Sequence, residues 1–181
     1  MEIKEIVKDD LAVLQDICVS TASGIYKDKP EQTKLLFLDY YVLYGIGYKL
    51  ICGKNTVGYA IASEDYKKYV KVYKAEFLLR LKEIDKAEYL KKKAELVLDK
   101  RLGRKYPAHL HIDILEGYQG KGNGSKLLSA LLDRLKADGV KGVWLGVDVK
   151  NERAINFYLK HGFKKHRLLG RNGVYVKKLS D

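Results

Sequence analysis

The chain has 181 residues, of which 46% are hydrophobic and 32% are charged, and this balance predicts a single globular domain over residues 1–181. The formal net charge of +12 favours anionic ligands, such as a phosphate-bearing cofactor or a nucleic acid. Lysine supplies nearly all of the excess, whereas arginine is preferred for bidentate contacts with phosphates and bases. The composition therefore weighs against a nucleic-acid partner.

The two cysteines and the apolar segments indicate the compartment. Cys18 and Cys52 fall in a helical and a strand pattern, and we expect both to be small buried side chains in a reducing environment. No apolar run follows the N-terminus as in a signal peptide. The most apolar stretch, residues 35–47, is interrupted by Asp39 and is too short to span a bilayer. We expect a cytoplasmic protein without a membrane partner.

The N-terminal third predicts a strand, two helices and a hairpin. Residues 2–7 alternate as a short first strand, a helical pattern follows, and Pro30 opens a second helix. Residues 48–52 and 56–62 flank a Gly-Lys-Asn turn, which is typical of a β-hairpin.

Residues 64–104 change to a helical period. Apolar residues form two stripes, one of Tyr66, Tyr69, Tyr73, Phe77 and Leu81 and another of Leu90, Ala94, Val97 and Leu98. We expect one long helix or two, broken near residues 84–85, and interpret the segment as an amphipathic structural insert between the third and fourth strands.

The strand at residues 110–114 carries polar residues on one face. His109, His111 and Asp113 share this face, while the apolar residues between them take the other. Polar side chains on an interior strand need partners or water, which an acceptor cleft provides, although the three residues could instead bond one another or nearby backbone. The spacing also resembles part of a metal-binding motif, but Ile114 stands where its last histidine is needed, so we expect no metal.

A glycine-rich turn follows this strand, and a helix begins near Asn123 or Ser125. Gly120, Gly122 and Gly124 free the backbone of the turn, and a helix N-terminus after such a turn suits phosphate. A P-loop is excluded because Asn123 occupies its lysine position, and a dinucleotide fingerprint fails because Ser125 stands where its third glycine is needed.

The last third predicts a buried strand at residues 143–149, a helix that Asn151 caps, and a final hairpin. A nearly continuous apolar run places the strand inside the sheet. The Asn172-Gly173 pair predicts the two-residue turn of the hairpin.

Two motifs in this chain resemble those of one family. The turn carries Q-x-x-G-x-G from Gln119 to Gly124, and residues 151–163 carry N-x-x-A-x-x-F-Y-x-x-x-G-F. In this order and spacing, they resemble the signatures of the GCN5-related N-acetyltransferase (GNAT) superfamily. With the insert, residues 105–113 also resemble a bacterial subgroup related to the acetyltransferase-like domain of O-GlcNAcases, a domain regarded as a pseudo-acetyltransferase.

The resemblance implies an α/β (α+β) fold, in which a mixed central β-sheet is flanked by helices, and it implies acetyl-CoA as the cofactor. The family binds the pantetheine arm and acetyl group through the main chain of the strand, which corresponds here to Ile112 and Ile114. Its pyrophosphate-binding loop amides correspond to Gln119, Gly120, Lys121, Gly122, Asn123 and Gly124, with Ser125 as an addition. Asn151 matches an asparagine that contacts the cofactor.

The resemblance also implies catalytic roles. Tyr158 matches the tyrosine that protonates the departing thiolate, and a phenol can do so while neutral at pH 7. Asp113 is the candidate general base, with His111, His109 or water as alternatives. His109 and Tyr26 are candidates for contact with the acceptor.

We therefore expect transfer of an acetyl group to a primary amine of a small-molecule or peptide acceptor, by direct attack in a ternary complex. The alternative is a catalytically silent module that binds acyl-CoA or another ligand on the same fold. The sequence is compatible with a monomer or a homodimer.

Overall fold

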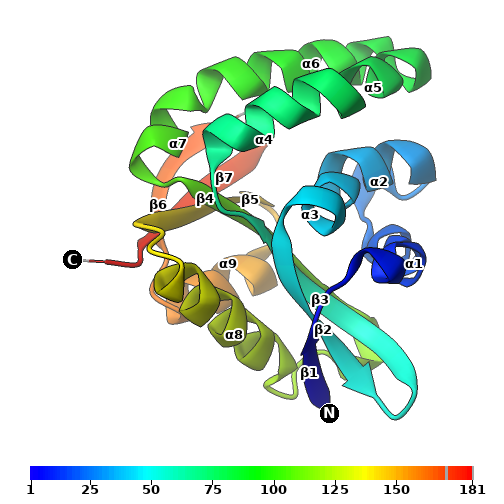
Figure 1. Cartoon of the computed structure of the whole chain (residues 1–181), viewed down its shortest axis with the longest axis vertical. Coiled ribbons are helices and arrows are strands. Elements are labelled where there is room, and N and C mark those ends of the chain that lie inside the picture. Colours follow the sequence, from blue (N-terminus) through cyan, green and yellow to red (C-terminus); the bar gives the residue numbers. More distant parts are fainter. Residues whose placement is uncertain (170, 181) are drawn as a thin grey trace.

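A seven-stranded sheet runs through the computed structural model, which describes residues 1–169 and 171–180 (Figure 1). The strand order is β1-β2-β3-β4-β5-β7-β6, with β4 and β5 parallel and the other neighbours antiparallel. The strands are β1 (Glu2–Glu5), β2 (Ile46–Cys52), β3 (Asn55–Ser63), β4 (Ala108–Ile114), β5 (Gly142–Asp148), β6 (Lys164–Leu169) and β7 (Asn172–Lys178).

Helices cover both faces of the sheet. The helices are α1 (Leu11–Thr21), α2 (Pro30–Phe37), α3 (Asp39–Tyr44), α4 (Tyr66–Val72), α5 (Leu78–Ile84), α6 (Lys86–Leu98), α7 (Lys100–Lys105), α8 (Asn123–Ala137) and α9 (Glu152–Lys160). Short 3-10 turns occupy Lys8–Asp10, Gly24–Tyr26 and Glu116–Tyr118. None of the described helices is long and apolar enough to cross a membrane.

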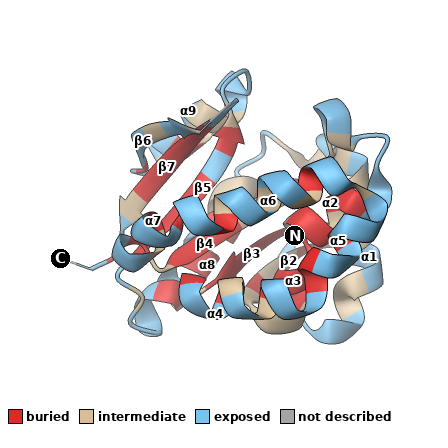
Figure 2. Ribbon diagram, turned by 90° about the horizontal axis from the view of Figure 1, so that it is seen from above, coloured by how far each residue is buried: buried red, intermediate tan, exposed pale blue. Residues whose placement is uncertain are grey.

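Two hydrophobic cores lie on opposite faces of the sheet. Helices α1 to α7 bury one core against residues such as Tyr59 and Ile61, and α8 and α9 bury the other against residues such as Ala60 and Leu110. The strands and the inner helix faces are buried, whereas the outer faces of α5 and α6 are exposed (Figure 2). The predicted α/β architecture, a mixed sheet flanked by helices, is confirmed.

The insert between β3 and β4 is a helical hairpin. A π-helical turn at Tyr73–Phe77 joins α4 to α5, and Asp85 ends this arm and caps α6 by accepting hydrogen bonds from the N–H groups of Ala87 and Glu88, both at 3.0 Å. The predicted break near residues 84–85 is confirmed, and the tyrosine stripe is buried as expected.

The second predicted stripe of the insert is wrong. Leu90, Val97 and Leu98 are 55%, 53% and 55% exposed, and Ala94 is exposed as well. The inward face of α6 instead carries Lys92, Glu95 and Leu96, which line a cavity together with Asp99, the residue that follows the helix. Apolar periodicity failed here because this helix turns polar side chains inward.

Two smaller expectations also need correction. The register of the last hairpin pairs Leu169 with Asn172, so Asn172 and Gly173 lie in β7 rather than in the turn. Cys18 is buried, but Cys52 is partly exposed, and neither forms a disulfide within the described residues.

The contact between α7 and α4 gives a test of how the insert is held. Gly103 lies on α7 so that an added Cβ would come within 2.6 Å of Cβ and Cγ of the buried Tyr66 side chain. We expect Gly103→Ala to destabilise the protein by about 1–3 kcal/mol through overpacking, although alanine favours helices by about 1 kcal/mol over glycine.

Urea unfolding would measure this difference. The control is Gly117→Ala, because a Cβ at Gly117 meets no heavy atom within 4 Å. Equal stability of the Gly103→Ala variant and the parent would contradict the assigned contact.

Candidate active site

The β4–β5 pair opens into a fork. The two strands pair where Ala108 faces Val143 and His109 faces Trp144, whereas β3 continues to pair with β4 as far as Ile114. Beyond His109, no ladder pairing joins β4 to β5 among the described residues. Main-chain groups at such an edge are free to bind an extended ligand.

The glycine-rich loop between β4 and α8 has free space beside its backbone. Gly120 and Gly122 have φ values of +75° and +76°, a region that glycine adopts without strain, and Gly122 directly precedes α8. A Cβ at Gly122 would meet no heavy atom within 4 Å, so the space beside it is open. The loop can therefore present the first N–H groups of α8, together with the positive end of its dipole, to an anion.

Side chains of the loop fix its shape. The Gln119 amide donates to the Ile114 carbonyl at 2.6 Å, and the Asn123 amide donates to the Tyr118 carbonyl at 2.9 Å. The Lys121 ammonium donates to the Gly117 carbonyl at 3.0 Å. The Gln119 and Asn123 amides are thus engaged within the loop, whereas main-chain N–H groups and the further donors of the exposed Lys121 ammonium can serve a ligand. Ser125 lies in the first turn of α8.

Helix α9 lies close against the loop and the start of α8. A Cβ at Gly124 would come within 3.3 Å of the Phe157 ring, and Asn151 caps α9 by accepting from the Ala154 N–H at 3.0 Å. The exposed Arg153 guanidinium would lie 3.8 Å from a Cβ at Gly120. Sequence reasoning missed Arg153, because it occupies a variable position of the second motif.

Arg153 also borders a hollow between the end of α1 and the loop. The hollow has a volume of about 270 Å³ and is lined by Ser20, Thr21, Leu115, Glu116, Gln119 and Arg153. It extends from the glycine loop toward the end of β4 that carries Asp113.

Asp113 lies on the face of β4 that α1 covers. It accepts a hydrogen bond from the Tyr59 hydroxyl at 2.5 Å, and Tyr59 is its cross-strand neighbour on β3. Burial raises the pKa of the Asp113 carboxyl above its usual range, while the bond from Tyr59 acts in the opposite direction. The sequence did not reveal Tyr59 as a partner, because the register of β3 against β4 was not known from it.

Burial favours the neutral form of both histidines of β4. Burial lowers the pKa of His111 to about 3, with the nearby Lys92 charge acting in the same sense, and its Nε2 lies 3.0 Å from the Tyr41 hydroxyl. Burial lowers the pKa of His109 well below its usual value. As bases at neutral pH, both are weaker than an ordinary histidine, and this favours Asp113 over His111.

Tyr158 reaches the same end of β4 from the opposite face. It lies on α9, is 7% exposed, and packs its ring against Phe157 and Phe163 with centroids 5.3 and 5.5 Å apart. Burial raises its pKa, and the charge of Asp113 raises it further. Asp113 and Tyr158 thus belong to opposite faces of the sheet.

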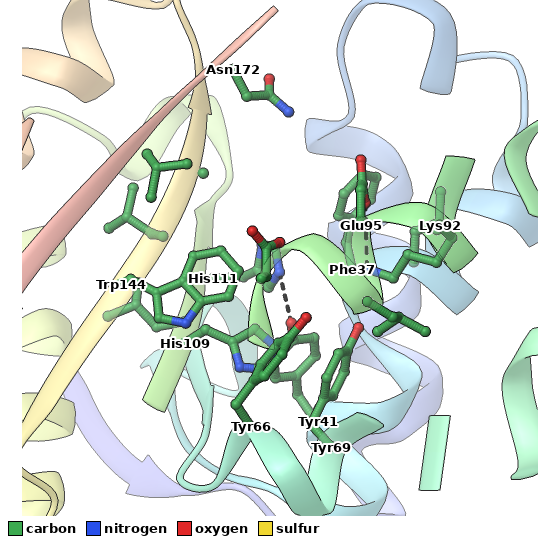
Figure 3. A pocket seen from close by; sticks show the side chains of 17 residues that line it. Phe37, Tyr41, Tyr66, Tyr69, Lys92, Glu95, His109, His111, Trp144 and Asn172 are labelled. Carbon is green, nitrogen blue, oxygen red and sulfur yellow. Dashed lines mark hydrogen bonds and ion pairs between the residues drawn. The ribbon is translucent and has the colours of Figure 1, made fainter. Parts of the chain in front are cut away.

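A cavity of about 120 Å³ lies between α6 and the point where β4 and β5 separate, at His109 and Trp144 (Figure 3). His109, His111 and Trp144 enter it from the sheet, Tyr41, Tyr66 and Tyr69 from α3 and α4, and Lys92, Glu95 and Asp99 from the insert. Asn172 stands at the side away from Tyr66 and Tyr69 in this view. Two of the predicted site residues, His109 and His111, thus share this cavity.

Tyr26 has other partners. Its hydroxyl donates to Glu88 at 3.0 Å and accepts from Lys91 at 2.9 Å, which ties the turn after α1 to α6. It is not among the residues that line either hollow. The structure therefore does not bring Tyr26 together with the other predicted site residues.

In the part of the chain that the structure describes, no three His, Cys, Asp or Glu side chains are placed to hold a metal ion.

Comparisons with known proteins agree with this arrangement. The profile of the acetyltransferase (GNAT) family matches residues 23–163. An uncharacterized N-acetyltransferase of Mycobacterium tuberculosis is 45% identical over 51 residues, which cover 28% of this chain and 33% of that protein. N-alpha-acetyltransferase 30 of Schizosaccharomyces pombe is 38% identical over 58 residues, which cover 32% of this chain and 39% of that protein. The matches thus span about a third of the length of these relatives.

Solved structures share the fold over nearly the whole chain. SsHAT has a TM-score of 0.84 at 24% identity, covering 99% of this chain and 98% of that one. The PaiA N-acetyltransferase of Thermoplasma acidophilum, in complex with coenzyme A, has a TM-score of 0.61 at 16% identity, covering 98% and 99%. YncA of Salmonella typhimurium, a putative acetyltransferase with acetyl-CoA, has a TM-score of 0.62 at 17% identity, covering 100% and 95%.

The raised pKa of Asp113 predicts a dependence of stability on pH. The native state favours the protonated carboxyl, so this contribution to stability is present below the unfolded pKa of about 3.9 and is lost as the pH rises through the native pKa. Asp113→Asn should therefore raise the melting temperature at neutral pH, and the gain should vanish toward pH 4.

Thermal unfolding between pH 4 and pH 8 would measure this gain. Asp133→Asn, an exposed position on α8, serves as a control for the loss of one negative charge. A gain for Asp113→Asn that is the same at every pH would refute the assigned burial effect.

Proposed function

Because the chain belongs to the acetyltransferase (GNAT) family, we propose that it transfers an acetyl group from acetyl-CoA to a primary amine. The observation that carries this proposal is the end of β4–β5 pairing at His109, beyond which Asp113 lies on one face of the sheet and Tyr158 packs on the other, in the core that contains Ile114. A base on one face of the strand and a proton donor on the other suit direct attack of an amine on a thioester.

The residues around the fork fit a CoA-like cofactor. The glycine loop offers open backbone positions at a helix N-terminus, which suits a pyrophosphate, and Arg153 adds a cation beside Gly120. The free edge of β4 around Ile112 suits an amide-bearing arm, whereas the Ile114 carbonyl already accepts from Gln119. The complexes of PaiA and YncA with coenzyme A and acetyl-CoA support this assignment.

The chain's own groups can serve each proton transfer. When bound, acetyl-CoA supplies the thioester, whose carbon–sulfur bond breaks as the amide bond to the acceptor nitrogen forms. Asp113 takes the proton that the acceptor nitrogen loses, and Tyr158 donates a proton toward the departing sulfur. Main-chain N–H groups of β4 at the fork are the donors for the charge that develops on the carbonyl oxygen.

Direct attack in a ternary complex is favoured over an acyl-enzyme. Cys18 is 3% exposed, and burial raises the pKa of its thiol to about 12. A thiolate is the nucleophilic form of cysteine, so Cys18 is inert at neutral pH.

Since both cysteines are free within the described residues, we also place the protein in a reducing compartment such as the cytoplasm. We take residues 1–181 to act as one domain, as a monomer or a homodimer.

Calorimetric titration with acetyl-CoA, followed by a thiol-release assay over a panel of amines, tests the proposal. We expect saturable binding, and thiol release that depends on an amine. Binding without release would instead favour a silent binding module, and the absence of binding would refute the assigned loop.

Tyr158→Phe separates catalysis from cofactor binding. It removes the hydroxyl and keeps the ring between Phe157 and Phe163, so we expect turnover to fall by about 10²-fold or more with little change in acetyl-CoA affinity. Thiol release and calorimetry measure the two effects. Tyr175→Phe, which removes a hydroxyl from the same core, should retain turnover, and equal loss of turnover and affinity in Tyr158→Phe would contradict its role.

Arg153→Ala tests the predicted phosphate contact. We expect acetyl-CoA to bind roughly three- to tenfold more weakly, because an exposed charge-assisted contact contributes modestly. The difference should shrink at high salt, where exposed charges are screened. Arg101→Ala on the exposed surface of α7 removes the same charge and should leave the affinity unchanged. Identical behaviour of the two variants would exclude a local contact.

A further inference from the structure

The carboxyl group of Asp113 has no cation beside it. Asp113 is partly buried on β4, and it belongs to none of the ion pairs among residues 1–169 and 171–180. Burial without a positive partner favours the protonated form of a carboxyl group, and the pKa of Asp113 is raised accordingly. A base must be ionised to accept a proton, so the proposed transfer needs another group that stabilises this carboxylate.

Tyr59 is placed to stabilise it. The Tyr59 hydroxyl donates a hydrogen bond to Oδ2 of Asp113 at 2.5 Å, and the two residues face each other across the β3–β4 ladder. The tyrosine is 0% exposed and is packed in the core that α1 helps to form. A hydrogen bond to an anion is short and about twice as strong as one between neutral groups. The strand register and the core thus both hold the hydroxyl against one oxygen of the carboxylate.

The other titratable groups that act with Asp113 in the described chain are neutral at pH 7. Cys18 faces it from α1, and burial raises the pKa of this thiol to about 12. Tyr158 lies on α9 beyond the sheet, and its pKa is also raised by burial and by the charge of Asp113. His111 is the next residue on the same face of β4, and burial lowers its pKa to about 3. None of these groups offers a positive charge to the carboxylate.

The Thr21 hydroxyl is a second donor near the carboxyl group. It lowers the pKa of Asp113, but less than Tyr59 does. A hydroxyl has one proton to donate, and Thr21 donates to the Ile17 carbonyl at 2.8 Å within α1. Tyr59 is therefore the main donor to the carboxylate.

We propose that Tyr59 is a positioning residue for the acetyl transfer: its hydroxyl holds Oδ2 of Asp113, keeps the carboxylate ionised near neutral pH, and leaves Oδ1 to take the proton that the acceptor nitrogen loses. The catalytic meaning of this inference rests on the proposed function, whereas the effect of Tyr59 on Asp113 can be measured without catalysis.

Tyr59→Phe removes the hydroxyl and keeps the ring. The carboxylate then loses its donor while its burial remains, so the pKa of Asp113 rises further. We expect the acidic limb of the pH profile of kcat/KM for thiol release to move upward by about one pH unit or more. The variant should therefore lose about tenfold or more in kcat/KM relative to the parent at low pH, and less at high pH. Calorimetry should show unchanged acetyl-CoA affinity.

Tyr73→Phe is the matched control. Tyr73 is buried in the same core as Tyr59, and its hydroxyl donates to the Leu35 carbonyl at 3.1 Å instead of to a carboxylate. The control loses a buried hydroxyl and one hydrogen bond, but its acidic limb should stay at the pH of the parent. A loss of kcat/KM in Tyr59→Phe that is equal at every pH would overturn the proposal, because general damage to the packing acts in that way.

Carbon-13 NMR of the aspartate carboxyl carbons tests the same effect without catalysis. The Asp113 signal is identified by its loss in Asp113→Asn. We expect it to titrate at a higher pH in Tyr59→Phe than in the parent and in Tyr73→Phe. The same midpoint in all three proteins would overturn the assigned effect of Tyr59.

The two measurements distinguish this inference from the proposed transfer. A shifted NMR midpoint, with no thiol release from the parent, would refute the transfer and support the effect of Tyr59 on Asp113. Thiol release from the parent, with neither the midpoint nor the pH profile moved in Tyr59→Phe, would overturn the role of Tyr59 and leave the transfer standing.

Discussion

β4 and β5 lie parallel where Ala108 faces Val143 and His109 faces Trp144, and then they separate. The separation is possible because each strand is held on its other side, β4 by β3 and β5 by β7, along nearly its full length. Main-chain groups that a continuous sheet would pair are thereby left for a ligand. The glycine loop, Asp113 and the aromatic cavity all lie along β4 or directly after it, so their relative positions depend on this opening.

The insert completes the cavity from the side opposite the sheet. Tyr66, Tyr69 and Tyr73 fix its first arm in the core, and Asp85 turns the chain so that α6 packs back beside α5. The inward face of α6 then brings Lys92 and Glu95 over the histidines of β4. This helix buries Leu96 but exposes Leu90 and Leu98, and it places Lys92 and Glu95 beside Leu96 at the cavity. The mixed character of this face distinguishes it from a helix whose inward face is wholly apolar.

The sequence alone predicted the order of the elements, the glycine loop and the cap at Asn151, because each depends on local periodicity or on backbone chemistry. It did not reveal the bond from Tyr59 to Asp113 or the stacking of His109 on Trp144, because both depend on how strands far apart in the chain come into register. The orientation of α6 was predicted wrongly for a similar reason, since apolar spacing assumes an apolar core.

Burial raises the pKa of both groups to which the proposed transfer assigns a proton. It favours the neutral forms of Asp113 and Tyr158, so the carboxylate becomes a stronger base, while the phenol keeps its proton. The negative charge of Asp113 holds the pKa of Tyr158 higher still. In the proposed transfer, protonation of Asp113 by the acceptor would remove this charge and make Tyr158 a better acid. Deprotonation of the acceptor on one face of β4 would then favour proton donation to the leaving group from the other.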